Sequence, residues 1–233
     1  MNNIFVAEIF KTFDKIYCIN LPSRIDRWQN CLLQFKKYNI NNNLQKFDGI
    51  IYENFYFNNK QNSHLGCWFS HYNVLKDAKK LNYNKILILE DDFVFNCEPE
   101  EIDLKLSSCI NELPQNWDLL YLGAYFVKGY DYDAKINYSK NLYKANTAFC
   151  THSICYSKNG INKMISAMEK AFLNLRSIPL NYESIGWFYV KEFLYENNCY
   201  ASKEFLCGQK EGFSDIEGKV VDYKDYFLKG YET

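Results

Sequence analysis

The sequence lacks several features that would each indicate a particular class of protein. Its 233 residues include 27 lysines and arginines and 28 aspartates and glutamates, a formal net charge of -1, so the basic excess of a nucleic-acid-binding protein is missing. No run of 18 apolar residues occurs, and no transmembrane helix is expected. Residues 1–8 do not resemble a signal peptide. We therefore expect a soluble, cytoplasmic protein that binds no nucleic acid, with peripheral docking on a membrane left open.

Metal-binding cysteine motifs are also missing. The nine cysteines form no CxxC pair, and the three histidines stand at no ligand spacing from them. The cysteine count is odd and several lie in apolar stretches, which indicates reduced thiols packed in a core. A structural zinc site is therefore not expected. There is no glycine-lysine loop of the Walker type either.

What is present is an alternation of strand and helix patterns. Apolar periodicity predicts helices at 24–38, 65–81, 100–113, 159–171 and 187–195, and a loop at 52–62. It predicts strands at 15–21, 45–48, 85–89, 117–123, 147–156 and around 199–201. The alternation implies an α/β fold whose sheet is mainly parallel and covered on both faces. Without a repeat or a linker-like boundary, residues 1–233 are expected to form one domain.

An acidic triplet, Glu90-Asp91-Asp92, directly follows the clearest strand. Strand periodicity would place Glu90 and Asp92 on one face and Asp91 on the other. Carboxylates this close repel one another unless a cation lies between them. Mg²⁺ and Mn²⁺ take oxygen ligands and often share them with a phosphate, so we predict a metal site that neutralises a leaving diphosphate. A solvated acidic turn is the alternative, and the triplet alone does not separate glycosyl transfer from phosphoryl transfer or phosphate-ester hydrolysis.

Four segments, in order, together resemble glycosyltransferase family 25, which includes bacterial lipooligosaccharide galactosyltransferases and procollagen galactosyltransferases. They are the strand that ends in Asn20-Leu21 with Arg24 and Asp26-Arg27 after it, the pair Asp48-Gly49, the run 65–71 (Leu-Gly-Cys-Trp-Phe-Ser-His), and the acidic triplet. Residues 209–216 look like a late Gln…Ser-x-Ile element of the family. The resemblance is strongest over residues 15–95 and weaker beyond 145.

One departure from the family concerns an aspartate that usually follows a proline after a late helix. The corresponding stretch here is 178–187, where Asn181 or Gly186 would occupy that place and Glu183 lies nearby. If that aspartate holds donor, metal or acceptor, this chain either uses Glu183 or is impaired.

The resemblance implies a GT-A-type, Rossmann-like fold for nucleotide sugars, with a mixed, mostly parallel sheet and helices on both faces. It also implies a UDP-sugar donor, galactose or glucose as the hexose, inversion of configuration, a glycan or protein acceptor and Mn²⁺ (or Mg²⁺) dependence. A catalytically weak binding protein and a metal-dependent phosphoryl-transfer enzyme are the alternatives.

Residue roles follow from these motifs. Asp92 is the first choice as metal ligand, supported by Glu90 or Asp91 through ribose or bound water. The donor-binding candidates are Asn20, Arg24, Arg27, Asp48, Ser70, His71, Glu90 and Asp91. Among them the arginines suit a diphosphate, and Asn20 suits uracil or ribose. Exposed arginines, a turn asparagine and a structural histidine are the alternative readings.

Inverting transfer needs a general base for the acceptor hydroxyl. Asp215 and Glu183 are the candidates, although both could be ordinary surface carboxylates. Gln209 and Ser214 are expected on the acceptor side. The sequence names neither the sugar nor the linkage nor the acceptor.

Overall fold

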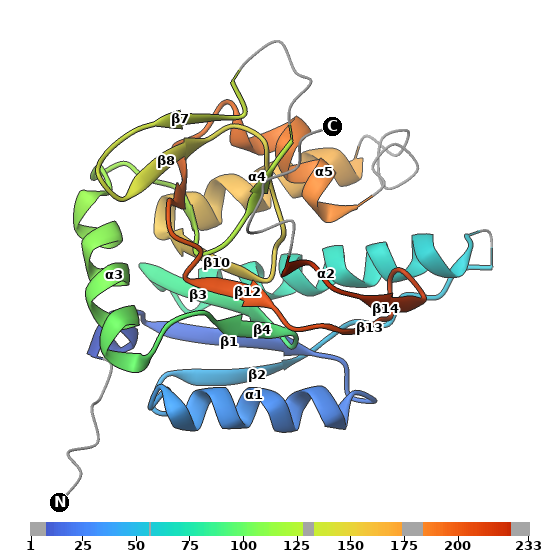
Figure 1. Cartoon of the computed structure of the whole chain (residues 1–233). Coiled ribbons are helices and arrows are strands. Elements are labelled where there is room, and N and C mark those ends of the chain that lie inside the picture. Colours follow the sequence, from blue (N-terminus) through green and yellow to red (C-terminus); the bar gives the residue numbers. More distant parts are fainter. Residues whose placement is uncertain (1–7, 56, 128–132, 174–183, 225–233) are drawn as a thin grey trace, which may run out of the picture.

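The computed structural model describes residues 8–55, 57–127, 133–173 and 184–224, which contain an eight-stranded sheet in the order β2-β1-β3-β10-β5-β11-β8-β7 (Figure 1). Its strands are β1 (Lys15–Asn20), β2 (Leu44–Asp48), β3 (Lys85–Glu90), β5 (Leu119–Tyr121), β7 (Lys135–Asn137), β8 (Leu142–Ala145), β10 (Ser153–Ser157) and β11 (Cys199–Ser202). β1 pairs in parallel with β2 and β3, and β5 with β11. β10 and β8 run antiparallel to their neighbours, so the sheet is mixed.

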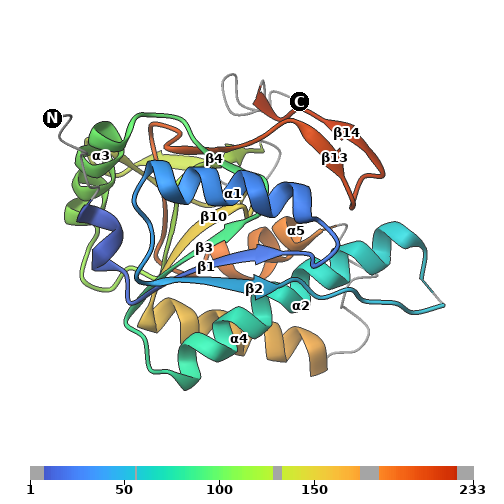
Figure 2. The ribbon, with the colours of Figure 1, turned by 90° about the horizontal axis from the view of Figure 1, so that it is seen from below.

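Helices cover both faces of this sheet. They are η1 (Glu8–Thr12, a 3₁₀ helix), α1 (Ile25–Lys37), α2 (Asn59–Lys80), α3 (Pro99–Glu112), α4 (Lys158–Leu173), α5 (Ile185–Tyr189) and the π-helical turn η2 (Val190–Leu194). Figure 2 shows α1 on one side of the sheet and α2 and α4 on the other. The predicted α/β fold class, with a mixed sheet between helices, is confirmed.

Burial on both faces explains why the first and third strands are continuous apolar runs. Tyr17 and Ile88 belong to the core under α2, α4 and α5. Cys18 and Leu89 belong to the core under η1, α1 and α3. All nine cysteines are free thiols, as the sequence predicted. None of the described helices combines the length and the apolar character that a membrane span needs.

Three short strand pairs lie outside the main sheet: β4 (Phe93–Phe95) with β12 (Cys207–Gln209), β6 (Tyr125–Phe126) with β9 (Ala148–Phe149), and β13 (Gly212–Ser214) with β14 (Lys219–Val221). The sequence did not predict β4, β6, β7 or β8, nor the late strands β12, β13 and β14. Strands of two to four residues are too short to show an alternating pattern. The pairing of residues 212–221, here called the hairpin, brings the late part of the chain beside the acidic triplet.

Two predicted boundaries were wrong. The helix expected from residue 65 begins at Asn59, because Asn58 and Gln61 form a capping box, so part of the predicted loop is helical. The strand expected at 147–156 is interrupted at Cys150, whose φ of 81° lies in the left-handed region, and it forms β9 and β10 instead. The assignment of residues 1–233 to one domain stays a prediction.

Candidate functional site

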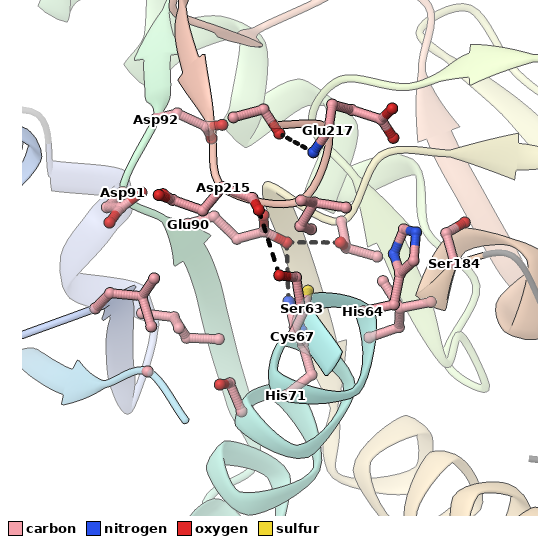
Figure 3. Close-up of a pocket in the computed structure, with 18 of the residues that line it drawn as sticks. Ser63, His64, Cys67, His71, Glu90, Asp91, Asp92, Ser184, Asp215 and Glu217 are labelled. Carbon is pink, nitrogen blue, oxygen red and sulfur yellow. Dashed lines mark hydrogen bonds and ion pairs between the residues drawn. The ribbon is translucent and has the colours of Figure 1, made fainter. Parts of the chain in front are cut away.

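A pocket of about 340 Å³ lies beyond the carboxyl ends of β1, β2 and β3. Carboxyl strand ends are where ligands bind in open α/β sheets. Its walls come from the segments that follow these strands, from α2, from the start of α5 and from the hairpin. Figure 3 shows the acidic triplet of β3 in this pocket together with Cys67 and His71 of α2 and Asp215 and Glu217 of the hairpin.

Glu90, the last residue of β3, is held from two sides. Its Oε1 lies 2.9 Å from Nε2 of His71 and accepts a hydrogen bond of 2.6 Å from the hydroxyl of Thr151. Burial raises the pKa of Glu90, but His71 and Thr151 lower it by more, so the net pKa lies below the usual value. The net shift favours the ionised form of Glu90, and α2 and the segment before β10 fix its orientation.

Asp91 is neutralised by residues that follow β1. Nη1 of Arg27 donates to its Oδ1 at 2.6 Å, and Nδ2 of Asn20 donates to its Oδ2 at 2.8 Å. The second arm of the Arg27 guanidinium donates to the carbonyl of Phe213 at 2.6 Å. Arg27 thus joins the acidic triplet to the hairpin. Burial still raises the pKa of Asp91 above its usual value, although Arg27 and Asn20 oppose that shift.

Of the three carboxylates in the triplet, Asp92 has the weakest stabilisation of its negative charge by neighbouring donors and cations. Its Oδ2 accepts a hydrogen bond of 3.1 Å from Nε2 of Gln209, and Arg27 is 3.8 Å away. Its Oδ1 is buried and has no hydrogen-bond partner among the described residues. Burial and then the charge of Glu90 raise the pKa of Asp92 to about 7. This side chain is the one that a bound cation would stabilise most.

The expected alternation of the triplet between two faces was wrong. β3 ends at Glu90, and all three carboxylates line the same pocket, because residues 91 and 92 form a turn that re-aims them. The premise that a cation must separate all three charges was also too strong. Protein donors compensate Glu90 and Asp91, and of the triplet's fully buried oxygens only Oδ1 of Asp92 has no hydrogen-bond partner among the described residues.

The remaining donor-binding candidates occupy different positions. Ser70 lines the pocket, where its hydroxyl accepts from the Ile50 backbone N–H at 2.8 Å and fixes the segment after β2. Asn20 is only 1% exposed and holds Asp91. Asp48 is a largely exposed partner of Lys46 and does not line the pocket.

Arg24 does not line the pocket, but it links α1 to the hairpin. Its Nη1 lies 2.5 Å from Oδ2 of Asp215, and its other nitrogens bind Asp26. Asp215 lines the pocket together with Gln209 and Ser214. Glu183 and Asn181 lie outside the described residues, whereas Gly186 lines the pocket.

Two groups of side chains could be tested against a metal ion. Asp92 offers an unpartnered buried carboxylate oxygen, the ligand type that Mn²⁺ and Mg²⁺ take, so the residues fit the expected ion. Ligand atoms of Cys67, His71 and Glu90 also lie within 4.8 Å of one another. Burial raises the pKa of the Cys67 thiol well above its usual value, which keeps it protonated and a poor ligand for a hard cation.

Sequence reasoning missed several residues of the pocket. Thr151 holds Glu90 but stands in a segment that was predicted to be a plain strand. Tyr125 and Phe149 line the pocket from the short pair β6–β9. No local motif marks them, and only the order of the strands brings them to the site.

Comparison with known proteins identifies the family. The family described as glycosyltransferase family 25 (LPS biosynthesis protein) matches residues 13–174. Procollagen galactosyltransferase 2 of Homo sapiens is 27% identical over 103 residues, 44% of this chain and 16% of that protein. A glycosyltransferase 25 family member of Anopheles gambiae is 25% identical over 182 residues, 69% of this chain and 30% of that protein. The chain therefore spans less than a third of the length of these relatives.

Among solved structures, a glycosyltransferase involved in the glycosylation of the major capsid of PBCV-1 aligns with a TM-score of 0.44 and 12% identity. The alignment covers 78% of this chain and 76% of that one. The family match extends over more than half of the chain and includes all four motifs on which the resemblance rested. The chain belongs to glycosyltransferase family 25.

Proposed function

We propose that the pocket binds a UDP-hexose, with galactose or glucose as the sugar, and transfers the hexose with inversion to a hydroxyl of a glycan or protein acceptor. The family supports a glycosyltransferase as the class of enzyme. The observation that carries the donor proposal is the pairing of Arg27 with a buried, under-compensated Asp92 at the carboxyl ends of β1 and β3. Asp92 can bind a metal cation and Arg27 can bind phosphate oxygens, and the two groups side by side suit a metal-bound diphosphate.

Asp92 would hold the divalent ion, Mn²⁺ or Mg²⁺, through its unpartnered Oδ1. Glu90 is the second candidate ligand, because the hydrogen bonds from His71 and Thr151 both involve Oε1 and leave Oε2 available. An ion bound there would share the negative charge that develops on the leaving diphosphate. His71 and Thr151 keep Glu90 ionised and oriented, and in this way they would position the site without contacting the donor.

Arg27 would bind the diphosphate. Its guanidinium already makes two hydrogen bonds, to Asp91 and to the carbonyl of Phe213, so it is fixed in the pocket before a ligand arrives. Such preorganised charge stabilises a leaving anion without a reorganisation cost. Arg24, Asn20, Ser70 and Asp48 stay candidates for donor binding, with Asn20 and Ser70 acting through Asp91 and the segment after β2.

Asp215 is the described candidate for the general base. In the reaction the acceptor oxygen forms a bond to the anomeric carbon, the bond from that carbon to the diphosphate breaks, and the hydroxyl proton passes to the carboxylate. Nη1 of Arg24 lies 2.5 Å from Oδ2 of Asp215, so this carboxylate oxygen is already occupied by the guanidinium. The proposal therefore requires that Arg24 release Asp215, for example to a phosphate of the donor. Glu183 stays the second candidate.

The experiment is a measurement of UDP release from UDP-galactose and UDP-glucose with and without Mn²⁺. We expect Asp92→Asn to lower kcat on the order of 100-fold, a typical loss when one electrostatic group of an active site is removed. Glu211→Gln, which changes an exposed carboxylate that does not line the pocket, is the matched control and should leave turnover unchanged. Full turnover by the Asp92 variant would refute the metal role.

A second candidate function, a binding protein with weak or no turnover, is favoured by one observation. The described base candidate is already occupied by Arg24. Calorimetry with UDP and Mn²⁺ separates the two functions: tight binding without turnover on any acceptor would establish the second. A cytoplasmic location stays a prediction.

A further inference from the structure

A second cavity of about 600 Å³, here called the annex, adjoins the pocket that contains the acidic triplet, here called the donor pocket. The two cavities share the lining residues Tyr125, Phe149, Glu217, Val221 and Tyr223. The annex lies between the pair β6–β9, the start of α5 and the hairpin. A ligand in the annex would therefore lie next to a donor bound in the donor pocket.

Three aromatic rings form a packed unit on one wall of the annex. Tyr125 and Phe149 face each other across the β6–β9 pair, with ring centroids 5.5 Å apart and planes within 11° of parallel. Trp187 of α5 meets Phe149 edge-on at 4.9 Å. Phe149 is buried, whereas Tyr125 and Trp187 remain partly exposed, so these two present ring surface to the cavity.

Gly186 makes this packing possible. A Cβ atom at Gly186 would lie 3.0 Å from Cδ1 of Phe149, closer than ordinary van der Waals contact, so a side chain there would push the ring away. Gly186 is one of the two residues, with Asn181, expected as alternatives for the place of the family's late aspartate. Because glycine has no side chain, Trp187 of α5 can pack against the Phe149 ring. This wall of the annex is therefore formed by aromatic side chains.

The hairpin and the two residues after it supply charged side chains to the annex. Glu217, Lys219 and Asp222 line it beside Val220 and Val221, and Glu217 is positioned by an ion pair of 3.0 Å with Lys60. An aromatic wall buries a flat apolar surface, and carboxylates in the same cavity accept hydrogen bonds from hydroxyl groups. A pyranose ring has this pair of surfaces: a face of C–H groups and a rim of hydroxyls.

We propose that the annex is the acceptor subsite and that its ligand is a sugar ring of a glycan, stacked on Tyr125 and Trp187. This inference rests on the proposed function, because it assigns the acceptor of that reaction to a carbohydrate rather than a peptide. The nucleotide belongs in the donor pocket, where Arg27 and Asp92 lie after β1 and β3. Phe149 and Gly186 act by positioning the two exposed rings.

The test measures saturation transfer from the protein to lactose and to methyl β-galactopyranoside by NMR, with UDP and Mn²⁺ present. We expect transfer to the sugar protons in the unchanged protein and a dissociation constant about tenfold higher in Trp187→Ala and Tyr125→Ala. Tyr195→Ala, which removes an exposed aromatic that lines neither cavity, is the matched control and should bind as the unchanged protein does. Trp187→Phe keeps a ring and should lose less than Trp187→Ala.

Calorimetry with UDP on the same samples keeps the two ideas distinguishable. UDP binding that persists in Trp187→Ala, whose ring lines the annex and not the donor pocket, with sugar binding weakened in Trp187→Ala and Tyr125→Ala but not in Tyr195→Ala, supports the inference. UDP binding together with sugar binding that Trp187→Ala and Tyr125→Ala leave unchanged overturns it. So does saturation transfer to a hydroxylysine-containing peptide but to neither sugar. Failure of UDP to bind at all refutes the proposed function instead.

Discussion

The charge on Asp92 should destabilise the protein in the absence of a bound ion. Its pKa is about 7 in the folded chain and 3.8 as the ordinary value. The folded state therefore disfavours the ionised form, and each unit of pKa difference corresponds to about 1.4 kcal/mol. Three units give an upper limit of about 4 kcal/mol at pH values above 7. Asp92→Asn removes this charge, and its amide oxygen can still accept from Gln209.

The sign follows from proton linkage. Below about pH 4 both states bind the proton and the substitution gains nothing. Between pH 4 and pH 7 the unfolded state has lost its proton and the folded state has not, so the penalty grows by about 1.4 kcal/mol per pH unit. Above pH 7 it is constant. The attraction to Arg27 already lowers this pKa and is therefore contained in the limit. Because relaxation and water penetration reduce the penalty of a buried charge, we expect a net gain of about 2 kcal/mol at pH 8.

Thermal unfolding at pH 5 and at pH 8 is the assay. For a chain of this length about 2 kcal/mol corresponds to a rise in Tm of roughly 4–8 °C at pH 8, and the rise should be smaller at pH 5. Asp26→Asn is the control, because Arg24 lowers the pKa of Asp26 and its removal should not stabilise at either pH. A Tm for Asp92→Asn that is unchanged or lower at pH 8 would refute the electrostatic reasoning. Added Mn²⁺ should raise the Tm of the unchanged protein and not of the variant.

Three further results are expected. Asp118→Ala should lower stability by about 3 kcal/mol in thermal unfolding, because this fully buried carboxylate accepts hydrogen bonds from Lys163 and Asn159 at 2.7 Å and from the backbone N–H of Asn198 at 3.0 Å, and these donors would lose their acceptor. Gly160→Ala should destabilise strongly and Gly212→Ala should not, since an added Cβ would lie 1.9 Å from a backbone oxygen at the first position and meets nothing within 4 Å at the second. Arg27→Lys should raise KM for the donor about tenfold in the UDP-release assay, because a lysine cannot bridge Asp91 and the hairpin with two arms; an unchanged KM would remove Arg27 from the donor site.

The sequence predicted best the strands that are buried on both faces and the helices whose apolar residues recur at regular helical spacing. The run 85–89 became β3 and the run 159–171 became the main part of α4, because continuous burial and helical spacing leave local traces. The start of α2 could also have been found: Asn58 and Gln61 are a capping pair visible in the sequence. The break at Cys150 could not, since a non-glycine residue with positive φ carries no local signal.

The candidate site also contains residues that the sequence could identify and residues that it could not. The four motifs identified the family and selected Asp92, Arg27, His71 and Glu90, all of which line one pocket. The aromatic wall of Tyr125, Phe149 and Trp187 has no motif. It depends on a two-residue strand pair and on the absence of a side chain at Gly186.

The sequence by itself determined which chemical groups are available: an acidic triplet after a buried strand, arginines after the first strand, and a histidine on the helix between them. Only the tertiary structure decided how each carboxylate is compensated. The partners of Glu90 and Asp92, namely Thr151 and Gln209, lie 61 and 117 positions away. The free energy of a buried charge depends on which donors the fold places within about 3 Å of it. Spacing along the chain does not encode that distance.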